Sequence, residues 1–489
     1  MIKINYSFVR KWFFLNALFL LYLTRYILVG FKYGPILDDY IQYFWYSNAY
    51  ENISDVFFGI GTITTRPLAA ISDIYFWSYF FLNPVILTFM LSRASFFAVY
   101  FLANTLEQMR IKVGALFYII LLFMPLCIES QYWLSASSRV IAGVLTAGFS
   151  MRVFSFYKKK KNVFLLILFC ILHFASMCFY EQASIFSFIL CVAYFYRTNE
   201  ERKMYIIPIV NVCVIAIYYL IFKNTGSFAR RFEIFLPQEI ISRLVFVLKE
   251  MYNVIIEGVF VMNVKSFLRS CTILKALPWL FAAILGMAFI VSALYEKRSD
   301  NKNNKQRFAF LFGFCVIVFS LLPVFIIRAS YLSYRMAFIP LIGVAIIASQ
   351  IFNRCNMTQS KKRIIIFLLL FIFSVSCVSE INDYKSTSDT DKLICTNIIS
   401  NLDEGVLSGE RECYVLCKKN VFTSLNSRHA EHILSVASSD WALTGAVRYY
   451  AKRNVKRIIP VDTINDEILK SSSQIIELCD DFSIKVIRM

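Results

Sequence analysis

The sequence predicts an all-α polytopic membrane protein, with about eleven transmembrane helices followed by a small C-terminal α/β domain. Of its 489 residues, 58% are hydrophobic and only 17% are charged, whereas about a quarter of the residues of an average soluble domain are charged. The chain also contains 49 Phe and 28 Tyr beside only 15 Gly. Because one globular core cannot bury so much apolar surface, a lipid bilayer is the expected solvent for most of the chain.

Eleven apolar segments approach the length of about 20 residues that a membrane-spanning helix needs. The first of them is expected to stay in the protein as a span, because no small-residue cleavage site of a signal peptide follows it. The predicted spans are residues 12–31, 82–106, 113–128, 140–157, 162–179, 183–196, 204–222, 278–295, 308–327, 336–352 and 364–379.

Lysine and arginine are concentrated in alternate connections between these spans, for example in residues 158–161 and 361–363. Since basic residues favour the cytoplasmic side, this pattern predicts a cytoplasmic N-terminus and a periplasmic C-terminal domain in a multi-pass protein of a bacterial inner membrane. The same pattern argues against a nucleic-acid ligand, although the net charge is +19. The basic residues lie in short runs between apolar segments and do not form one basic surface.

The predicted membrane region covers residues 1–379 and has two long outer loops, residues 32–79 and 223–277. Residues 380–489 have the composition of a soluble domain, with short apolar stretches at 414–416 and 457–461 and a helical pattern around 432–450. We therefore expect a small α/β domain there. Its four cysteines, at positions 395, 413, 417 and 479, leave both a disulfide bond and free thiols open.

Three acidic residues are candidates for catalysis. Asp38 and Asp39 directly follow the first span, where a carboxylate can act as a general base on an acceptor hydroxyl. Adjacent carboxylates also raise each other's pKa, although a solvated turn is an equally good explanation of the pair. Glu181 lies between the fifth and sixth spans among apolar residues. A carboxylate there is costly unless it is paired or solvated, which favours a functional role.

Arginine and aromatic residues on the outer side are candidates for substrate binding. Arg66, Arg328 and Arg335 can hold the phosphate of a lipid substrate, or can contact lipid head groups as snorkelling side chains do. Tyr40 suits stacking on a sugar ring, with an interfacial aromatic belt as the alternative. Trp133 lies in a short outer loop that can line an acceptor groove. The sequence has no cluster of His and Cys with metal-binding spacing, so we expect no metal.

The segments Leu37-Asp38-Asp39-Tyr40, Arg66-Pro67-Leu68 and Tyr180-Glu181-Gln182 occur in this order on the predicted outer side. In order and placement they resemble the membrane glycosyltransferases of the GT-C fold. More narrowly, the chain resembles the bacterial and phage-borne type II (Gtr) O-antigen glucosyltransferases, which convert serotype. The resemblance covers roughly the first 340 residues, and the C-terminal segment shares a layout with the family but no motif.

The resemblance implies transfer of glucose from undecaprenyl-phosphate glucose to a sugar of lipid-linked O-antigen at the periplasmic face, without a metal or other cofactor. It implies that Asp38 or Asp39 is the base, that Arg66 with Arg328 or Arg335 holds the donor phosphate, and that Glu181 positions the acceptor or supports the base. A flippase and a donor-synthesising glucosyltransferase are the expected partner proteins. The alternatives are an O-antigen polymerase or ligase, and a flippase or transporter of lipid-linked sugars, although transporters usually show internal repeats and interrupted helices.

Overall fold

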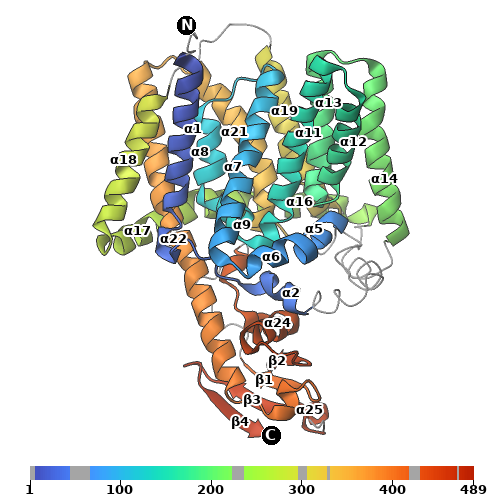
Figure 1. Cartoon of the computed structure of the whole chain (residues 1–489), viewed down its shortest axis with the longest axis vertical. Coiled ribbons are helices and arrows are strands. Elements are labelled where there is room, and N and C mark those ends of the chain that lie inside the picture. Colours follow the sequence, from blue (N-terminus) through green and yellow to red (C-terminus); the bar gives the residue numbers. More distant parts are fainter. Residues whose placement is uncertain are drawn as a thin grey trace.

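The computed structural model describes residues 6–44, 66–222, 236–295, 305–327, 331–417, 430–470 and 473–488. Within these residues, long helices form a bundle, and a smaller domain projects from one end of it (Figure 1). The bundle helices are α1 (Tyr6–Thr24), α7 (Pro84–Gln108), α8 (Ala115–Phe123), α11 (Val140–Lys160), α12 (Val163–Met177), α13 (Glu181–Thr198), α14 (Ile206–Phe222), α18 (Pro278–Leu294), α19 (Lys305–Ser320), α21 (Tyr334–Arg354) and α22 (Gln359–Ile399).

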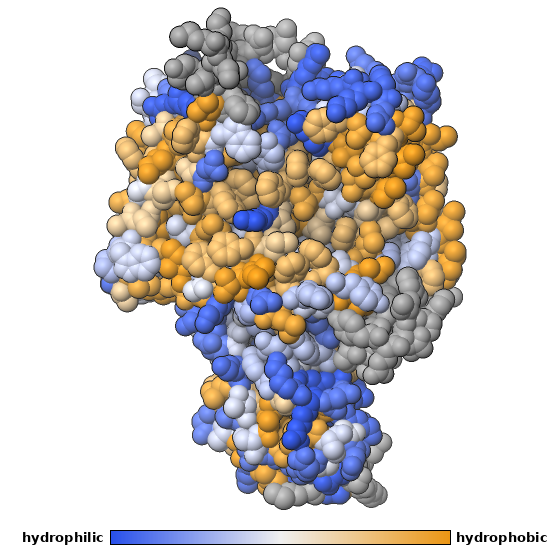
Figure 2. Space-filling view, viewed as in Figure 1, coloured by the Kyte–Doolittle hydropathy of each residue, from blue (hydrophilic) through white to orange (hydrophobic). Residues whose placement is uncertain are grey.

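Each predicted span overlaps one of these helices, and the apolar helices are those of a helical membrane protein. On the face in view, Figure 2 shows an apolar band across the bundle, with hydrophilic residues gathered above and below it. Six stretches of the described residues are long and apolar enough to cross a bilayer: Pro84–Gln108, Leu134–Lys160, Arg202–Phe222, Arg307–Ile326, Tyr334–Arg354 and Gln359–Ile399. Four other predicted spans coincide with helices that do not meet these requirements of length and apolarity, namely α1, α12, α13 and α18. Eleven crossings therefore stay a prediction.

The third predicted span, residues 113–128, is not one straight helix. Helix α8 ends at Phe123, and the chain turns by 60° into the segment Pro125–Tyr132. Proline has no N–H to donate and disfavours helical backbone at the preceding residue. Met124 accordingly has an extended backbone, with φ −64° and ψ 125°. The bent segment contains α9 (Ile128–Tyr132), which lies at the end of the bundle that carries the projecting domain (Figure 1).

Helix α22 differs most from its predicted span, residues 364–379. It is 41 residues long and continues without a break past the predicted domain boundary at 379/380. One helix therefore belongs to both the bundle and the projecting domain (Figure 1). We call the described residues from 400 onward, which pack against the second half of α22, the C-terminal domain.

The two predicted outer loops are largely helical where the structure describes them. Residues 67–81 form α5 (Pro67–Ser72), the π-helical turn η3 (Asp73–Trp77) and α6 (Ser78–Phe81). The second loop forms α16 (Ile240–Asn253), the π-helical segment η7 (Val254–Val261) and α17 (Met262–Lys275). Several of these short helices lie across the domain-side end of the bundle (Figure 1).

The C-terminal domain contains one small sheet, as the apolar stretches at 414–416 and 457–461 predict. Its order is β2-β1-β3-β4, in which β1 runs parallel to β2 and β3, and β4 runs antiparallel to β3. The strands are β1 (Cys413–Leu416), β2 (Ile458–Val461), β3 (Gln474–Leu478) and β4 (Ile484–Arg488), and helix α24 (Asp440–Ala451) lies between β1 and β2 in the chain. No disulfide bond forms between cysteines of the described residues, which is the arrangement of the thiol alternative for the C-terminal cysteines.

Candidate functional site

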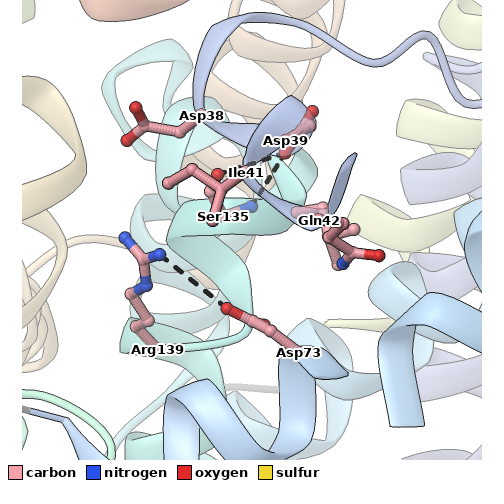
Figure 3. A pocket seen from close by; sticks show the side chains of 8 residues that line it. Asp38, Asp39, Ile41, Gln42, Asp73, Ser135 and Arg139 are labelled. Atoms are coloured by element: carbon pink, nitrogen blue, oxygen red, sulfur yellow. Dashed lines mark hydrogen bonds and ion pairs between the residues drawn. The ribbon is translucent and has the colours of Figure 1, made fainter. Parts of the chain in front are cut away.

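The candidate acidic and basic residues gather where the bundle meets the C-terminal domain. The chain leaves α1 and forms the short turn η2 (Leu37–Tyr40), which carries both aspartates. Leu37 has a φ of +31°, an uncommon backbone for this residue type. Asp38 and Asp39 point apart, and a small open pocket lies beside them (Figure 3). The pocket is lined by Asp38, Asp39, Ile41, Gln42, Asp73, Leu134, Ser135 and Arg139.

Asp39 is buried and braces the surrounding backbone. Its carboxylate accepts hydrogen bonds from the Tyr33 hydroxyl (2.6 Å), from the Ile36 N–H (3.1 Å), and from the N–H and the hydroxyl of Ser135 (3.0 and 3.2 Å). Burial raises the pKa of Asp39 to about 7, although these four donors act in the opposite direction. The carboxylate thus connects η2 to α10 (Leu134–Ser137).

Asp38 has a different environment, because its side chain keeps 17% of its surface exposed and has a basic partner. Its Oδ2 atom lies 3.0 Å from Nη1 of Arg335. The other terminal nitrogen of Arg335 lies 2.9 Å from Oε2 of Glu431, a residue of the C-terminal domain. The guanidinium also lies over the ring of Trp133, 5.2 Å from its centroid. Of the two aspartates, Asp38 is therefore the one that can exchange its partner for a ligand.

Arg66 and Glu181, which the sequence analysis assigned to separate roles, form a pair. Arg66 Nε donates to both carboxylate oxygens of Glu181, at 3.0 and 3.1 Å, and its guanidinium lies over the Tyr180 ring. Pro67 begins α5 and Glu181 begins α13, so both partners stand at helix N-termini. Burial lowers the pKa of Arg66, but the Glu181 carboxylate outweighs burial, so the pKa is raised. The positive charge of Arg335 also lowers the pKa of Arg66, which shows that the Arg66–Glu181 and Asp38–Arg335 pairs are electrostatic neighbours.

The two aromatic candidates, Tyr40 and Trp133, are both buried. The Tyr40 side chain has no exposed surface, and its hydroxyl lies 3.2 Å from that of Tyr450 and 3.3 Å from the Pro35 carbonyl oxygen. Trp133 is equally buried, under Arg335. In this arrangement neither ring presents a face to a sugar, because each packs inside the junction between the bundle and the domain. The remaining candidate, Arg328, lies outside the described residues.

The structure adds a buried acidic residue to the pocket that sequence reasoning did not select. Asp73 lies in the π-helical turn η3, and its carboxylate faces Arg139 across the pocket at 3.8 Å (Figure 3). Burial raises the pKa of Asp73 to about 6, against the opposing effect of Arg139. Single π-helical turns are frequent at functional sites, but such a turn has no sequence signature.

Glu129 joins the bundle to the C-terminal domain. Its Oε2 accepts from the Arg335 N–H at 2.8 Å, and its Oε1 accepts from the N–H groups of Glu431 and His432 at 2.7 and 3.1 Å. The same oxygen lies 3.0 Å from Nδ1 of His432. Burial lowers the pKa of His432, but Glu129 and other carboxylates outweigh burial, so the pKa is raised. Glu431 and His432 have no recognisable motif around them, which is why sequence reasoning missed them.

The assembled site combines a partly exposed carboxylate, Asp38, with two arginines whose partners are carboxylates. Such a group can take a proton from a hydroxyl and can bind an anion if the arginines change partners. Within the described residues, one group of His and acidic side chains is close enough to share a metal ion, and it lies behind Glu129 (Glu380, Asp383 and His432). No family model, curated protein or solved structure matches the chain.

Proposed function

We propose that the protein is a GT-C-like glycosyltransferase that transfers glucose from undecaprenyl-phosphate glucose to a sugar of lipid-linked O-antigen. The reaction takes place at the periplasmic face of a bacterial inner membrane, which is the side of the C-terminal domain. The observation that carries the proposal is the ion pair of Asp38 with Arg335 at the edge of an open pocket. A candidate base and a candidate phosphate-binding group are thereby in direct contact.

Asp38 is the proposed general base. It accepts the proton of an acceptor hydroxyl while that oxygen bonds to the anomeric carbon of the donor, and the bond from this carbon to the phosphate oxygen breaks. The leaving group is the undecaprenyl phosphate, which takes the bonding electrons as negative charge. Asp39 holds the turn in place through its four hydrogen bonds. This division of roles follows from exposure, because of the two aspartates only Asp38 has a partly exposed side chain.

Arg335 and Arg66 are the proposed phosphate-binding residues. Each arginine is paired with a carboxylate, and each arginine side chain keeps about a fifth of its surface exposed, so a phosphate can reach both arginines. Charge-assisted hydrogen bonds from guanidinium groups to a departing phosphate stabilise its developing charge. The short helices of the site lie at the domain-side end of the bundle (Figure 1), so the polyprenyl chain of the donor would lie along the apolar surface of the bundle helices. Glu181 orients Arg66 through its hydrogen bonds, in place of the expected role in positioning the acceptor or supporting the base.

The test is a transfer assay with purified protein in detergent, radiolabelled undecaprenyl-phosphate glucose and lipid-linked O-antigen. Loss of a general base typically costs 10²–10⁴-fold in rate, so Asp38→Asn should lose about that much activity. The matched control is Glu404→Gln, since Glu404 is an exposed acidic residue of the C-terminal domain. Transfer by the wild type that survives in Asp38→Asn refutes the assignment of the base. No transfer by the wild type favours the polymerase, ligase or flippase alternatives.

A further inference from the structure

A second cluster of chemically active side chains lies deeper in the junction and takes no part in the proposed transfer. Glu380 and Asp383 are three residues apart on α22 and therefore share one face of that helix. His432, from the segment before α24, lies against the same face. One ligand atom from each of the three residues lies within 4.8 Å of the others, and all three residues are buried.

The imidazole of His432 is held in one orientation. Its Nδ1 lies 3.0 Å from the carboxylate of Glu129, while its Nε2 faces Glu380 at 3.7 Å. The Tyr384 ring stacks on the imidazole at 4.7 Å with an interplanar angle of 13°. A histidine whose one ring nitrogen donates to a carboxylate presents the other nitrogen as a metal ligand, and this carboxylate–histidine pairing recurs around metal ions in proteins.

The two carboxylates are also oriented by neighbours. The Ser266 hydroxyl donates to Oε1 of Glu380, which leaves Oε2 on the side of His432. Arg269 donates to both oxygens of Asp383, at 2.9 and 2.6 Å. Each carboxylate oxygen has a second lone pair, so these hydrogen bonds do not prevent either residue from binding a cation.

The charges of the junction favour a bound cation. Within the described residues, contacts lead outward from His432 to five carboxylates but only two guanidinium groups. Burying uncompensated charge is costly, so an excess of carboxylates calls for positive charge from another source. A proton on His432 supplies one positive charge, whereas a divalent ion supplies two. The carboxylates belong to Asp38, Glu129, Glu380, Asp383 and Glu431, and the guanidinium groups belong to Arg269 and Arg335.

We propose that Glu380, Asp383 and His432 bind a divalent transition-metal ion, Zn²⁺, which fastens the C-terminal domain to α22. One imidazole and two carboxylates form a ligand set that suits Zn²⁺ better than Mg²⁺ or Ca²⁺, which prefer oxygen ligands alone. With three protein ligands, a water molecule completes the usual tetrahedron. The ion lies behind Glu129 and touches none of the reacting groups, so its role is structural and independent of the proposed transfer.

The first measurement is the metal content of the full-length protein, purified in detergent without chelators through a tag that contains no histidine. Elemental analysis should find one zinc ion per chain. Because the chain also contains thirteen cysteines, X-ray absorption must then identify the ligands. One imidazole with oxygen ligands at about 2.0–2.2 Å supports the proposal, whereas sulfur ligands at about 2.3 Å overturn it. A wild-type protein that stays free of zinc after incubation with Zn²⁺ also overturns it.

Variants then locate the ion. His432→Gln and Glu380→Gln should lose the zinc, and Glu129→Gln should weaken zinc binding about 10–100-fold, because it removes the group that orients His432. The control is Asp389→Asn, since Asp389 is an exposed acidic residue of the same helix. Zinc content that is unchanged in His432→Gln refutes the site. The measurements do not use transfer activity, so this proposal and the proposed function can fail separately.

Discussion

The guanidinium of Arg335 lies between the carboxylates of Asp38 and Glu431, with its two terminal nitrogens 3.0 and 2.9 Å from them. Asp38 belongs to the segment that follows α1 and Glu431 to the C-terminal domain, so this single arginine connects three distant parts of the chain. Its backbone is fixed as well, because the Arg335 N–H donates to Glu129 and its carbonyl accepts from the Ser130 hydroxyl. A residue held this firmly can change its partner without changing its position.

Arg335→Lys should retain the positive charge but lose the planar fork that contacts two groups at once. We expect kcat/KM for undecaprenyl-phosphate glucose to fall by about 10²–10³, the usual cost of removing one donor to a developing anion. Steady-state kinetics in detergent would measure this. The control is Arg453→Lys, since Arg453 forms an exposed pair in the C-terminal domain. Equal activities of Arg335→Lys and wild type would exclude Arg335 from the phosphate site.

Asp39→Asn should lower Tm, whereas Asp38→Asn should leave it nearly unchanged. The amide that replaces the Asp39 carboxylate would turn an N–H donor toward groups that are themselves donors, and an unsatisfied buried polar group costs about 1–3 kcal/mol. Asp38 forms one partly exposed ion pair, so its replacement should cost little stability. Thermal unfolding of both variants in the same detergent would measure the difference. Equal Tm values for the two variants would show that Asp39 is not the bracing residue.

The stability difference between wild type and Asp39→Asn should also depend on pH. Burial raises the pKa of Asp39 from 3.8 to about 7 in the folded state. Between these values the folded protein binds more protons than the unfolded chain, so the wild type loses stability as pH rises through this window. The Asp39→Asn variant lacks this titration. Its Tm deficit should therefore be larger at pH 5 than at pH 8, and a constant deficit would contradict a raised pKa.

The helices of the bundle were predictable because runs of apolar residues are directly visible in the sequence. The bend at Pro125 was harder to predict, because residues 113–128 are apolar throughout. The proline alone does not distinguish a kink from a helix end. The length of α22 was not predictable at all. Its composition changes near residue 380 from apolar to polar, which marks the change of environment but not a break in the backbone.

The site was predictable only where function depends on residues near one another in the chain. Asp38 and Asp39 were both selected, but their different roles depend on Tyr33, Ser135 and Arg335, which approach them only in the folded structure. The pairing of Arg66 with Glu181 joins positions 115 residues apart. Such long-range pairs have no local pattern, and neither do Glu431 and His432.

Gly445→Ala should separate the C-terminal domain from η2. Gly445 lies in α24, and an added Cβ would fall far inside van der Waals contact of the backbone carbonyl oxygen of Tyr40. Because backbone atoms cannot move aside as a side chain can, α24 must shift. We expect a lower Tm and reduced transfer.

The matched control for Gly445→Ala is Gly286→Ala in α18, where an added Cβ meets nothing within 4 Å. Alanine is favoured over glycine in a helix by roughly 0.5–1 kcal/mol, so this variant should be neutral or slightly more stable. Thermal unfolding and the transfer assay compare the two variants. If Gly445→Ala behaved like Gly286→Ala in both assays, the close approach of α24 to Tyr40 would not exist in the protein.

Arg66 and Glu181 should act as one unit in the transfer reaction. If Glu181 serves only to orient Arg66, removing either side chain removes the same interaction, and the double variant should be no worse than the poorer single variant. The measurement is kcat/KM for wild type, Arg66→Ala, Glu181→Ala and the double variant. Losses that multiply would mean that Glu181 contacts the acceptor sugar on its own. The cycle therefore distinguishes an orienting carboxylate from a second substrate-binding residue. The hydrogen bonds at 3.0 and 3.1 Å between the two side chains favour the orienting role.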